Sequence, residues 1–532
     1  MSGSEGCGKS GLLAWLVRHG SQRGTPAERA VHAVVPAAGR SLRGTVWSLA
    51  DQLGVVARDR GELVAVLGRD PRRTVIVLPD LHEGDGIELV RSLARLPHVR
   101  LIVESRSGSP AHQRLAGSGC AELDLDLEQW RDHRRFEQWK ASLSEGEGSA
   151  VSGLEDTVVD LSDPVAVCAA DPWQVTAGYE SDGDRDHGGL RAAWLRAGQS
   201  LCREQSPASR ALSLLCVLGD SADPRLAPVL VELAAGSDWS VEWSRVRGDM
   251  APPWPGAVTT LALGEGPLAG CLLVVGAGGV VKAVHVADAS PRGRLPQGRG
   301  EPADATVTAD GTVLVLDQAG HVHADASWAA RPAGSGLAAL LDDTPTGAQR
   351  LVAAVQEHTG TALAYAAGLD LGIVALGGAT GTVRAFGDVA DSASLHDGPV
   401  RSLAALSVPI VGDTAVPLIY SGGADGTVRA WSPGHSPMTA PLVQRSCPVV
   451  SLDAAITDNG PSVVVAWGDG AVQWIEWDTG AQQTFRPGPP VRAVALDSDS
   501  RVYIGMDEAL TCLVPRRSQG GGSSPESDLR TV

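Results

Sequence analysis

Over the first third of the chain, short apolar runs alternate with stretches in which apolar residues recur at helical spacing. Residues 30–35, 74–78 and 99–103 are mostly apolar runs, which is typical of strands buried on both faces of a parallel sheet. Residues 41–58 carry Leu and Val at every third or fourth position, which predicts an amphipathic helix packed on such a sheet. The alternation of strands and helices predicts an α/β module over residues 1–125.

The pattern becomes helical over residues 126–237. The dipeptides Asp163-Pro164 and Asp171-Pro172 predict helix starts, because proline suits the first helical turn. Apolar residues at helical spacing predict further helices over residues 190–235, and three aromatic residues suggest a docked helix over residues 127–143. We therefore expect a helical domain that links the α/β module to the rest of the chain.

From about residue 255 the helical periodicity stops, and short strands rich in Val, Leu and Ala alternate with turns rich in Gly and Asp. Aligned on the second glycine, six turns step by 41, 61, 45, 44 and 38 residues, the last step ending at Glu508. The repeat of a WD40 propeller blade is about 40–45 residues. The step of 61 contains Thr359-Gly360 and predicts either a degenerate blade or a long insertion, so six or seven blades are expected. The turns lie at residues 276–281, 317–322, 378–383, 423–428, 467–472 and 505–510.

The clearest repeat joins residues 396–403 to residues 420–431. It resembles a WD40 repeat closely, through a Gly-Pro-Val-x-Ser-Leu inner strand, a Ser-Gly-Gly-x-Asp-Gly-Thr-Val-Arg turn and the terminal Trp431. Ser432 replaces the aspartate that usually follows this tryptophan. The resemblance implies an all-β, WD40-type propeller over residues 238–516, which binds a protein partner on one of its faces.

Two segments flank the repeats. Residues 240–246 alternate in polarity and predict an outer strand that closes the ring with the last blade. Residues 517–532, rich in Gly and Ser, predict a disordered tail. Within the repeats, His396, Asp425 and Asp469 combine residue types of a catalytic set, but they occupy different repeat positions and are interpreted as structural.

Candidate chemistry is concentrated at the start of the chain, where residues 3–10 fit the P-loop pattern G-x-x-x-x-G-K-[ST]. Glycines let backbone N–H groups point at phosphate oxygens, Lys9 would meet the β/γ-phosphates, and Ser10 would ligate Mg²⁺. Lysine occurs at only three positions of the chain, so its presence in the motif carries weight. The nucleotide-binding candidates are Gly3, Ser4, Glu5, Gly6, Cys7, Gly8, Lys9 and Ser10.

A P-loop normally follows a buried strand, yet only Met1 and Ser2 precede Gly3. We therefore expect the first strand of the sheet to be missing. Three explanations stay open: the true chain begins upstream, the strand comes from elsewhere, or the nucleotide site is crippled.

Two later strand ends carry further candidates. The run at residues 74–78 leads into Asp80 and Glu83, a pattern typical of a Walker B strand. Asp80 would hold Mg²⁺ through water, and Glu83 would polarise the attacking water. Arg106 follows the next strand, where it would sense the γ-phosphate. The alternatives are an ordinary acidic loop after a buried strand and an ordinary surface arginine.

In this order, residues 3–10, the strand ending in Asp80 and Glu83, and the strand ending in Glu104-Ser105-Arg106 resemble the STAND class of signal-transduction P-loop ATPases. The resemblance covers roughly residues 3–235 and implies ATP with Mg²⁺ as cofactors. It further implies catalytic roles for Glu83 and Arg106, and a winged-helix-like segment after the ATPase core. Together with the propeller, the arrangement resembles bacterial STAND proteins fused to WD40 repeats.

Composition restricts the partners. The net charge of −18 argues against a nucleic-acid binder and against binding to an anionic membrane surface. The eight cysteines are scattered without a C-x-x-C or Cys/His cluster, which argues against a zinc site. The sequence shows no secretory signal pattern and no apolar run of about 18–20 residues, so we expect a cytoplasmic protein with reduced thiols.

These patterns favour an ATP-binding signalling or regulatory switch that hydrolyses ATP slowly, if at all. Its propeller would bind a protein partner, and, by resemblance, its active form would assemble into a nucleotide-dependent oligomer. The alternative hypothesis is a non-enzymatic propeller scaffold that carries a truncated, inactive nucleotide module.

Overall fold

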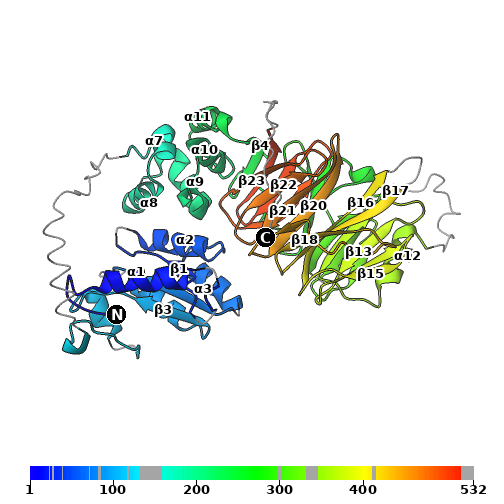
Figure 1. The fold of residues 1–532 in the computed structure, drawn as a ribbon. Helices are drawn as coiled ribbons and strands as arrows, with labels where there is room; N and C mark the ends of the chain where they lie inside the picture. Colours follow the sequence, from blue (N-terminus) through cyan, green and yellow to red (C-terminus); the bar gives the residue numbers. More distant parts are fainter. Residues whose placement is uncertain are drawn as a thin grey trace.

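The structure, a computed structural model, consists of an α/β module, a helical module and a β-propeller (Figure 1). In Figure 1 the blue α/β module and the teal helical module lie at one end, and the propeller, green to red, lies at the other. Most of the range 127–143 and the tail 517–532 fall outside the described residues. The structure describes residues 1–516 except 23, 27–28, 39, 71, 82–85, 117–118, 131–158, 184, 297–300, 331–344 and 410–414.

Residues 1–3 extend the parallel sheet of the α/β module. Met1 N donates to Val103 O at 2.9 Å, and Ser105 N donates to Met1 O at 3.0 Å. On its other side the same short segment forms a parallel bridge with Asp124. The first strand is therefore represented by a short extended segment between two neighbours, which corrects the expectation that it is missing.

The order across this sheet is β1, β2, β3, residues 1–3 and Asp124. Residues 1–3 thus lie inside the sheet, and the chain then continues to β1 at one edge. After β2 and β3 it reaches Asp124 at the other edge. Ligands bind at the carboxyl edge of open α/β sheets, where the strand order reverses in this way. The elements of the module are α1 (Lys9–Gly20), β1 (Ala33–Val34), α2 (Leu42–Gln52), α3 (Arg60–Arg69), β2 (Thr74–Leu78), α4 (Ile87–Ala94), β3 (Val99–Val103) and α5 (Pro110–Leu115).

The first two helices of the helical module begin where the Asp-Pro dipeptides predict. The Asp163 carboxylate accepts a hydrogen bond from Val165 N at 2.9 Å, and the Asp171 carboxylate accepts one from Trp173 N at 3.0 Å. Both aspartates therefore cap helices whose first turn contains proline, as expected. The helices are α7 (Pro164–Ala169), α8 (Pro172–Ser181), α9 (Leu190–Ala197), α10 (Pro207–Leu215) and α11 (Leu226–Leu233), with short 3₁₀ turns at His187–Gly189, Gly198–Cys202 and Ala234–Gly236.

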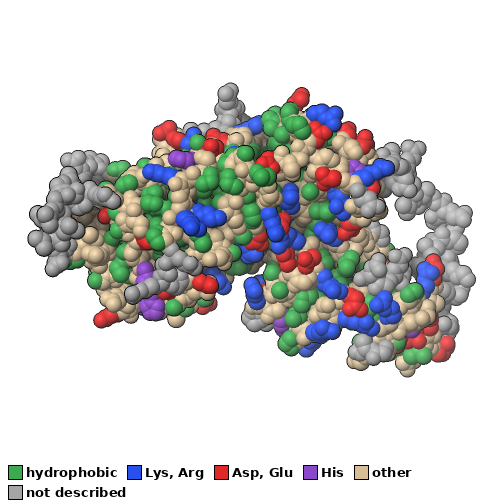
Figure 2. Space-filling view, turned by 180° about the vertical axis from the view of Figure 1, so that it is seen from behind, with side chains coloured by type: hydrophobic (Ala, Val, Ile, Leu, Met, Phe, Trp, Pro, Cys, Tyr) green, Lys and Arg blue, Asp and Glu red, His purple; other side chains and the backbone are tan. Residues whose placement is uncertain are grey.

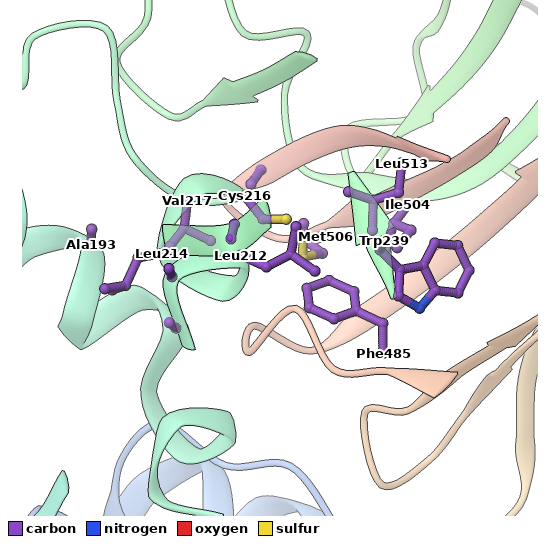
Figure 3. Packing of buried hydrophobic residues seen from close by; sticks show 14 of the residues in the cluster. Ala193, Leu212, Leu214, Cys216, Val217, Trp239, Phe485, Ile504, Met506 and Leu513 are labelled. Atoms are coloured by element: carbon purple, nitrogen blue, oxygen red, sulfur yellow. The ribbon is translucent and has the colours of Figure 1, made fainter. Parts of the chain in front are cut away.

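Helix α10 and its C-terminal end pack directly on the propeller, as Figure 3 shows. Hydrogen bonds flank this apolar contact: Ser213 Oγ donates to Arg486 O at 3.2 Å, and Ser244 Oγ donates to Cys216 O at 2.6 Å. The helical module and the last two blades therefore share one hydrophobic core, called here the joint core. Its members include Leu212, Leu214, Cys216 and Val217 from the helical module and Trp239, Phe485, Ile504, Met506 and Leu513 from the propeller.

The propeller has six blades, five with four strands and one with three strands among its described residues. All six turns aligned in the sequence join the second strand of a blade to the third. Blade 1 consists of β5 (Val258–Leu263), β6 (Cys271–Gly276), β7 (Val281–His285) and β8 (Pro291–Arg294), and blade 2 of β9 (Pro302–Val307), β10 (Val313–Asp317) and β11 (Val322–Asp325). Blade 3 consists of β12 (Ala362–Ala366), β13 (Ile373–Gly377), β14 (Thr382–Gly387) and β15 (Asp391–Ser394), and blade 4 of β16 (Val400–Pro409), β17 (Ala415–Gly423), β18 (Thr427–Trp431) and β19 (Val443–Gln444). Blade 5 consists of β20 (Val449–Thr457), β21 (Gly460–Trp467), β22 (Val472–Glu476) and β23 (Ala481–Phe485), and blade 6 of β24 (Val491–Leu496), β25 (Val502–Met506), β26 (Ala509–Pro515) and β4 (Trp239–Val246).

The step of 61 residues contains a helix and no seventh blade in its described part. Helix α12 (Gly347–Val355) begins at Thr346, which forms a capping box with Gln349. Leu351 and Val355 are buried in a cluster that joins blade 2 to blade 3. The insertion thus packs against two blades, and of the two blade numbers expected, six is correct.

The ring closes through β4, which pairs antiparallel with β26. Val246 lies opposite Ala509, and Trp239 lies opposite Pro515. This confirms the prediction that residues 240–246 supply the outer strand of the last blade.

We expect Leu212→Ala to destabilise the helical module and the propeller together. Leu212 is 1% exposed in the joint core, and such truncations typically cost about 2–5 kcal/mol. Chemical denaturation followed by tryptophan fluorescence should show an earlier transition. The control is Val231→Ala on α11, a 57% exposed side chain, which should leave the transition in place. Unfolding of the helical module alone, with the propeller unchanged, would contradict the shared core.

Candidate functional site

The loop at residues 3–10 requires glycine for two different reasons. Gly6 and Gly8 have left-handed backbones, with φ of 79° and 93°, which other residues rarely adopt. No atom lies within 4 Å of a Cβ built at either position, so the loop faces open space there. At Gly3 an added Cβ would instead collide with the Cys7 sulfur, so a side chain there would have to displace the Cys7 side chain.

The ammonium group of Lys9 lies inside this loop. Lys9 Nζ donates to Gly3 O at 2.9 Å and to Ser4 O at 2.7 Å, and it lies 3.6 Å from Cys7 Sγ. Lys9 is also the first residue of α1, and helix N-termini attract anions through their free N–H groups and the helix dipole. A buried cation and a helix N-terminus therefore meet at the carboxyl edge of the sheet.

Glu104 brings a carboxylate to the same edge. It directly follows β3, and its backbone is paired with Leu78 O and Leu81 N, both at 2.9 Å. Its side chain is nearly inaccessible, and Oε1 accepts a hydrogen bond from Ser10 Oγ at 3.2 Å. The other oxygen, Oε2, is buried without a hydrogen-bond partner. Sequence analysis placed Glu104 at a strand end and assigned no role to it.

Asp80 follows β2, the strand next to β3. Its φ of 55° is left-handed, a conformation that aspartate tolerates better than most residues do. The following residue, Leu81, is hydrogen-bonded to Glu104, so Asp80 lies at the same sheet edge as Glu104. Glu83 lies outside the described residues.

Arg106, which follows β3, contacts the glycine-rich loop. Its Nη2 atom lies 3.2 Å from Glu5 Oε2, and both side chains are largely exposed. Exposed ion pairs contribute about 0–1 kcal/mol, so this contact is a weak tether between the two segments. The structure thus brings Arg106 next to the loop, on its solvent side.

Asp126 is a loop contact that sequence analysis missed. Its carboxylate accepts hydrogen bonds from Ser4 N at 2.7 Å and from Ser4 Oγ at 2.6 Å. Glu122 acts similarly on Ser2, whose Oγ donates to it at 2.6 Å, and hydrogen bonds from Ser2 and His112 lower the Glu122 pKa. Neither acid belongs to a motif, so no sequence signal identifies them.

The α2–α3 loop, residues 53–59, connects the α/β module to both neighbours. The side-chain amide of Gln199 donates to Val55 O at 3.0 Å and accepts from Ala57 N at 3.3 Å. Arg58 Nη1 lies 3.5 Å from Glu508 Oε1 in the last blade. One short loop therefore contacts the helical module and the propeller together.

A channel of about 870 Å³ runs between the inner strands of the propeller. Asp304 and Asp453 lie in its wall, and each accepts a backbone N–H from the next blade: Leu363 N at 2.8 Å and Leu496 N at 2.9 Å, respectively. Burial raises the pKa of both aspartates to about 7. These side chains connect adjacent blades, which gives them a structural role.

His396 and Asp425 also have a structural role. His396 Nε2 lies 2.8 Å from Ser421 Oγ, and Nδ1 lies 3.0 Å from Thr427 Oγ1 and 3.2 Å from the Asp425 carboxylate. Burial lowers the pKa of His396. Asp469 belongs to another blade, where it pairs with two arginines. The three residues therefore form no common site, as the sequence interpretation holds.

On the face shown in Figure 2, acidic and basic side chains are interspersed and form no large patch of one sign. Throughout the part of the chain that the structure describes, no helix has the length and apolarity to cross a membrane.

A comparison with protein-family models and with curated proteins finds no match. Among solved structures, the crystal structure of the computationally designed Ika8 protein is 18% identical to this chain. The match covers 48% of this chain and 70% of the designed one, with a TM-score of 0.29. At that score the likeness carries no structural argument, and the propeller is established by its own strand pairing.

We expect Asp453→Asn to stabilise the propeller more at high pH than at low pH. The Asp453 carboxyl has a pKa of about 7 in the folded protein, against 3.8 when unfolded. The parent therefore keeps its full free energy of unfolding below about pH 4 and loses part of it as the pH rises through 7. The loss approaches about 4 kcal/mol for a dry site and less where channel water solvates the charge. Thermal unfolding at about pH 5 and pH 8.5 should show the variant gaining over the parent at the higher pH.

The control is Asp458→Asn, which removes an exposed carboxylate from the turn of the same hairpin. It should change the melting temperature equally at both pH values. Parallel pH profiles for Asp453→Asn and the parent would contradict the assigned pKa.

Proposed function

We propose that the α/β module binds ATP with Mg²⁺ as a nucleotide-dependent switch, and that the propeller binds a protein partner. The observation that carries the proposal is the glycine-rich loop. It combines a buried Lys9 ammonium, left-handed glycines facing open space and the N-terminus of a 12-residue helix. Each of these features favours a phosphate group.

The residues of the loop have distinct tasks in this proposal. Backbone N–H groups of residues 3–10 would surround the phosphates, and Lys9 would exchange its carbonyl partners for phosphate oxygens. Ser10 and Asp80 would hold Mg²⁺, which when bound neutralises phosphate charge. By resemblance to STAND ATPases, Glu83 would orient water and Arg106 would sense the γ-phosphate.

A switch also needs a connection to the propeller. The α2–α3 loop supplies one, because it contacts Gln199 of the helical module and Glu508 of the last blade. A nucleotide that favours one position of the α/β module would therefore alter these contacts, and a partner on the propeller would act in the reverse direction. Oligomerisation of the nucleotide-bound form belongs to the same proposal.

One observation favours the non-enzymatic scaffold as the second candidate. The Lys9 ammonium already donates to two carbonyl groups of its own loop, so a nucleotide has to displace both contacts. If that displacement is too costly, residues 3–10 bind no nucleotide, and the propeller is the functional part.

We expect Lys9→Ala to reduce the affinity for ATP·Mg²⁺ by at least about tenfold. A hydrogen bond to a charged group contributes about 1.5–3 kcal/mol, and each 1.4 kcal/mol changes Kd tenfold. Isothermal titration calorimetry on the full chain measures this affinity directly. The control is Arg18→Ala, which removes an exposed cation from the same helix and should bind as the parent does. If the parent binds no nucleotide, the switch hypothesis fails and the scaffold remains.

A further inference from the structure

Glu104 carries a buried oxygen atom that has no hydrogen-bond partner among the described residues. The residue is 1% exposed, Oε1 accepts from Ser10 Oγ, and Oε2 has no hydrogen-bond partner. Buried polar groups nearly always have a partner, and an uncompensated buried charge is costly. The nearby acids differ, because Glu122 accepts a hydrogen bond from the Ser2 side chain and Asp126 accepts one from the Ser4 side chain. Glu104 therefore lacks the partner that its neighbours have.

The position of Glu104 restricts what this partner is. β3 lies between β2, which leads into Asp80, and residues 1–3, which lead into the loop. Glu104 directly follows β3, so it lies between the two groups already expected at a metal, Asp80 and Ser10. Its contact with the Ser10 hydroxyl shows that the carboxylate lies on the loop side of this edge.

The chemistry of these groups favours a hard divalent cation. Mg²⁺ takes oxygen ligands, and in nucleotide sites it uses one or two carboxylates together with phosphate oxygens and water. A serine hydroxyl beside a carboxylate with a free oxygen fits that requirement. Among the described residues no three His, Cys, Asp or Glu side chains form a self-sufficient metal site, so the cation needs phosphate ligands as well.

We propose that Glu104 is a carboxylate of the Mg²⁺ site, acting beside Ser10 when Mg²⁺ arrives with a nucleotide. This inference rests on the proposed nucleotide-binding function and adds a residue to it. In the nucleotide-free chain, Glu104 accepts a hydrogen bond from the Ser10 hydroxyl and so orients the hydroxyl oxygen. With the metal bound, the Glu104 carboxylate faces the cation, directly or through a metal-bound water.

The test compares ATP binding with Mg²⁺ and ATP binding in EDTA, by calorimetry on the full chain. In Glu104→Gln the amide oxygen still accepts a hydrogen bond from the Ser10 hydroxyl, so the loop keeps its contact, but the negative charge is gone. We expect the affinity of this variant for ATP in the presence of Mg²⁺ to be about 10- to 100-fold lower than that of the parent. Its affinity for ATP in EDTA should be unchanged. The matched control is Glu122→Gln, which neutralises another carboxylate near the loop and should keep the full Mg²⁺ effect.

The outcomes separate the two proposals. If the parent binds ATP in neither condition, the nucleotide-binding function fails and this inference fails with it. If the parent binds ATP and Glu104→Gln keeps the full Mg²⁺ effect, only the role of Glu104 is overturned.

A second measurement needs no variant, in case Glu104→Gln does not fold. Fe²⁺ replaces Mg²⁺ in the presence of ATP, and ascorbate with peroxide then cleaves the backbone near the bound iron. Mass spectrometry of the parent chain should find cleavage beside Ser10 and Glu104. Cleavage only at other strand ends, or none above that seen without ATP, would overturn the proposal.

Discussion

The arrangement of the whole chain depends on the apolar contact between α10 and the last two blades of the propeller. In the joint core, side chains such as Leu212 and Trp239 are buried against one another, so neither module has a complete surface alone. Because the helical module is fixed on the propeller, Gln199 is fixed too, and through it the α2–α3 loop. The candidate site is therefore attached to the propeller through one continuous series of contacts.

The fold was most predictable where the sequence repeats. In five of the six blades a glycine with positive φ lies in the turn between the second and third strands, as at Gly279 and Gly426, whereas Glu508 takes that position in the last blade. Helix α12 could not be assigned in this way, because an insertion has no counterpart in the other blades. The strand position of residues 1–3 was not predictable for another reason. Three residues are too few to show a periodicity, and their hydrogen-bond partners, residues 103–107 and 123–125, lie far away in the sequence.

The candidate site was predictable only in its local part. Residues 3–10 form one motif, and in the structure the Lys9 ammonium lies inside this loop while Gly6 and Gly8 have left-handed backbones. Nucleotide binding by this loop stays a prediction. Glu104 and Asp126 contact that loop from positions 94 and 122 residues away, so their relation to it exists only in the folded sheet. Sequence patterns identify residues that are neighbours along the chain, whereas a carboxylate facing a distant serine has no local signature.

The pairing of β4 with β26 has a consequence for how the protein is made. Val246 and Ala509 become neighbours only after all six blades are in place, and such long-range contacts are slow to form because loop closure costs entropy. During synthesis β4 leaves the ribosome before every other propeller strand, and its hydrogen-bonding edge stays unpaired until β26 is made. Unpaired strand edges promote aggregation, so the growing chain is vulnerable until its last strand arrives. The last blade to be translated therefore supplies the strand that covers the open edge of β4.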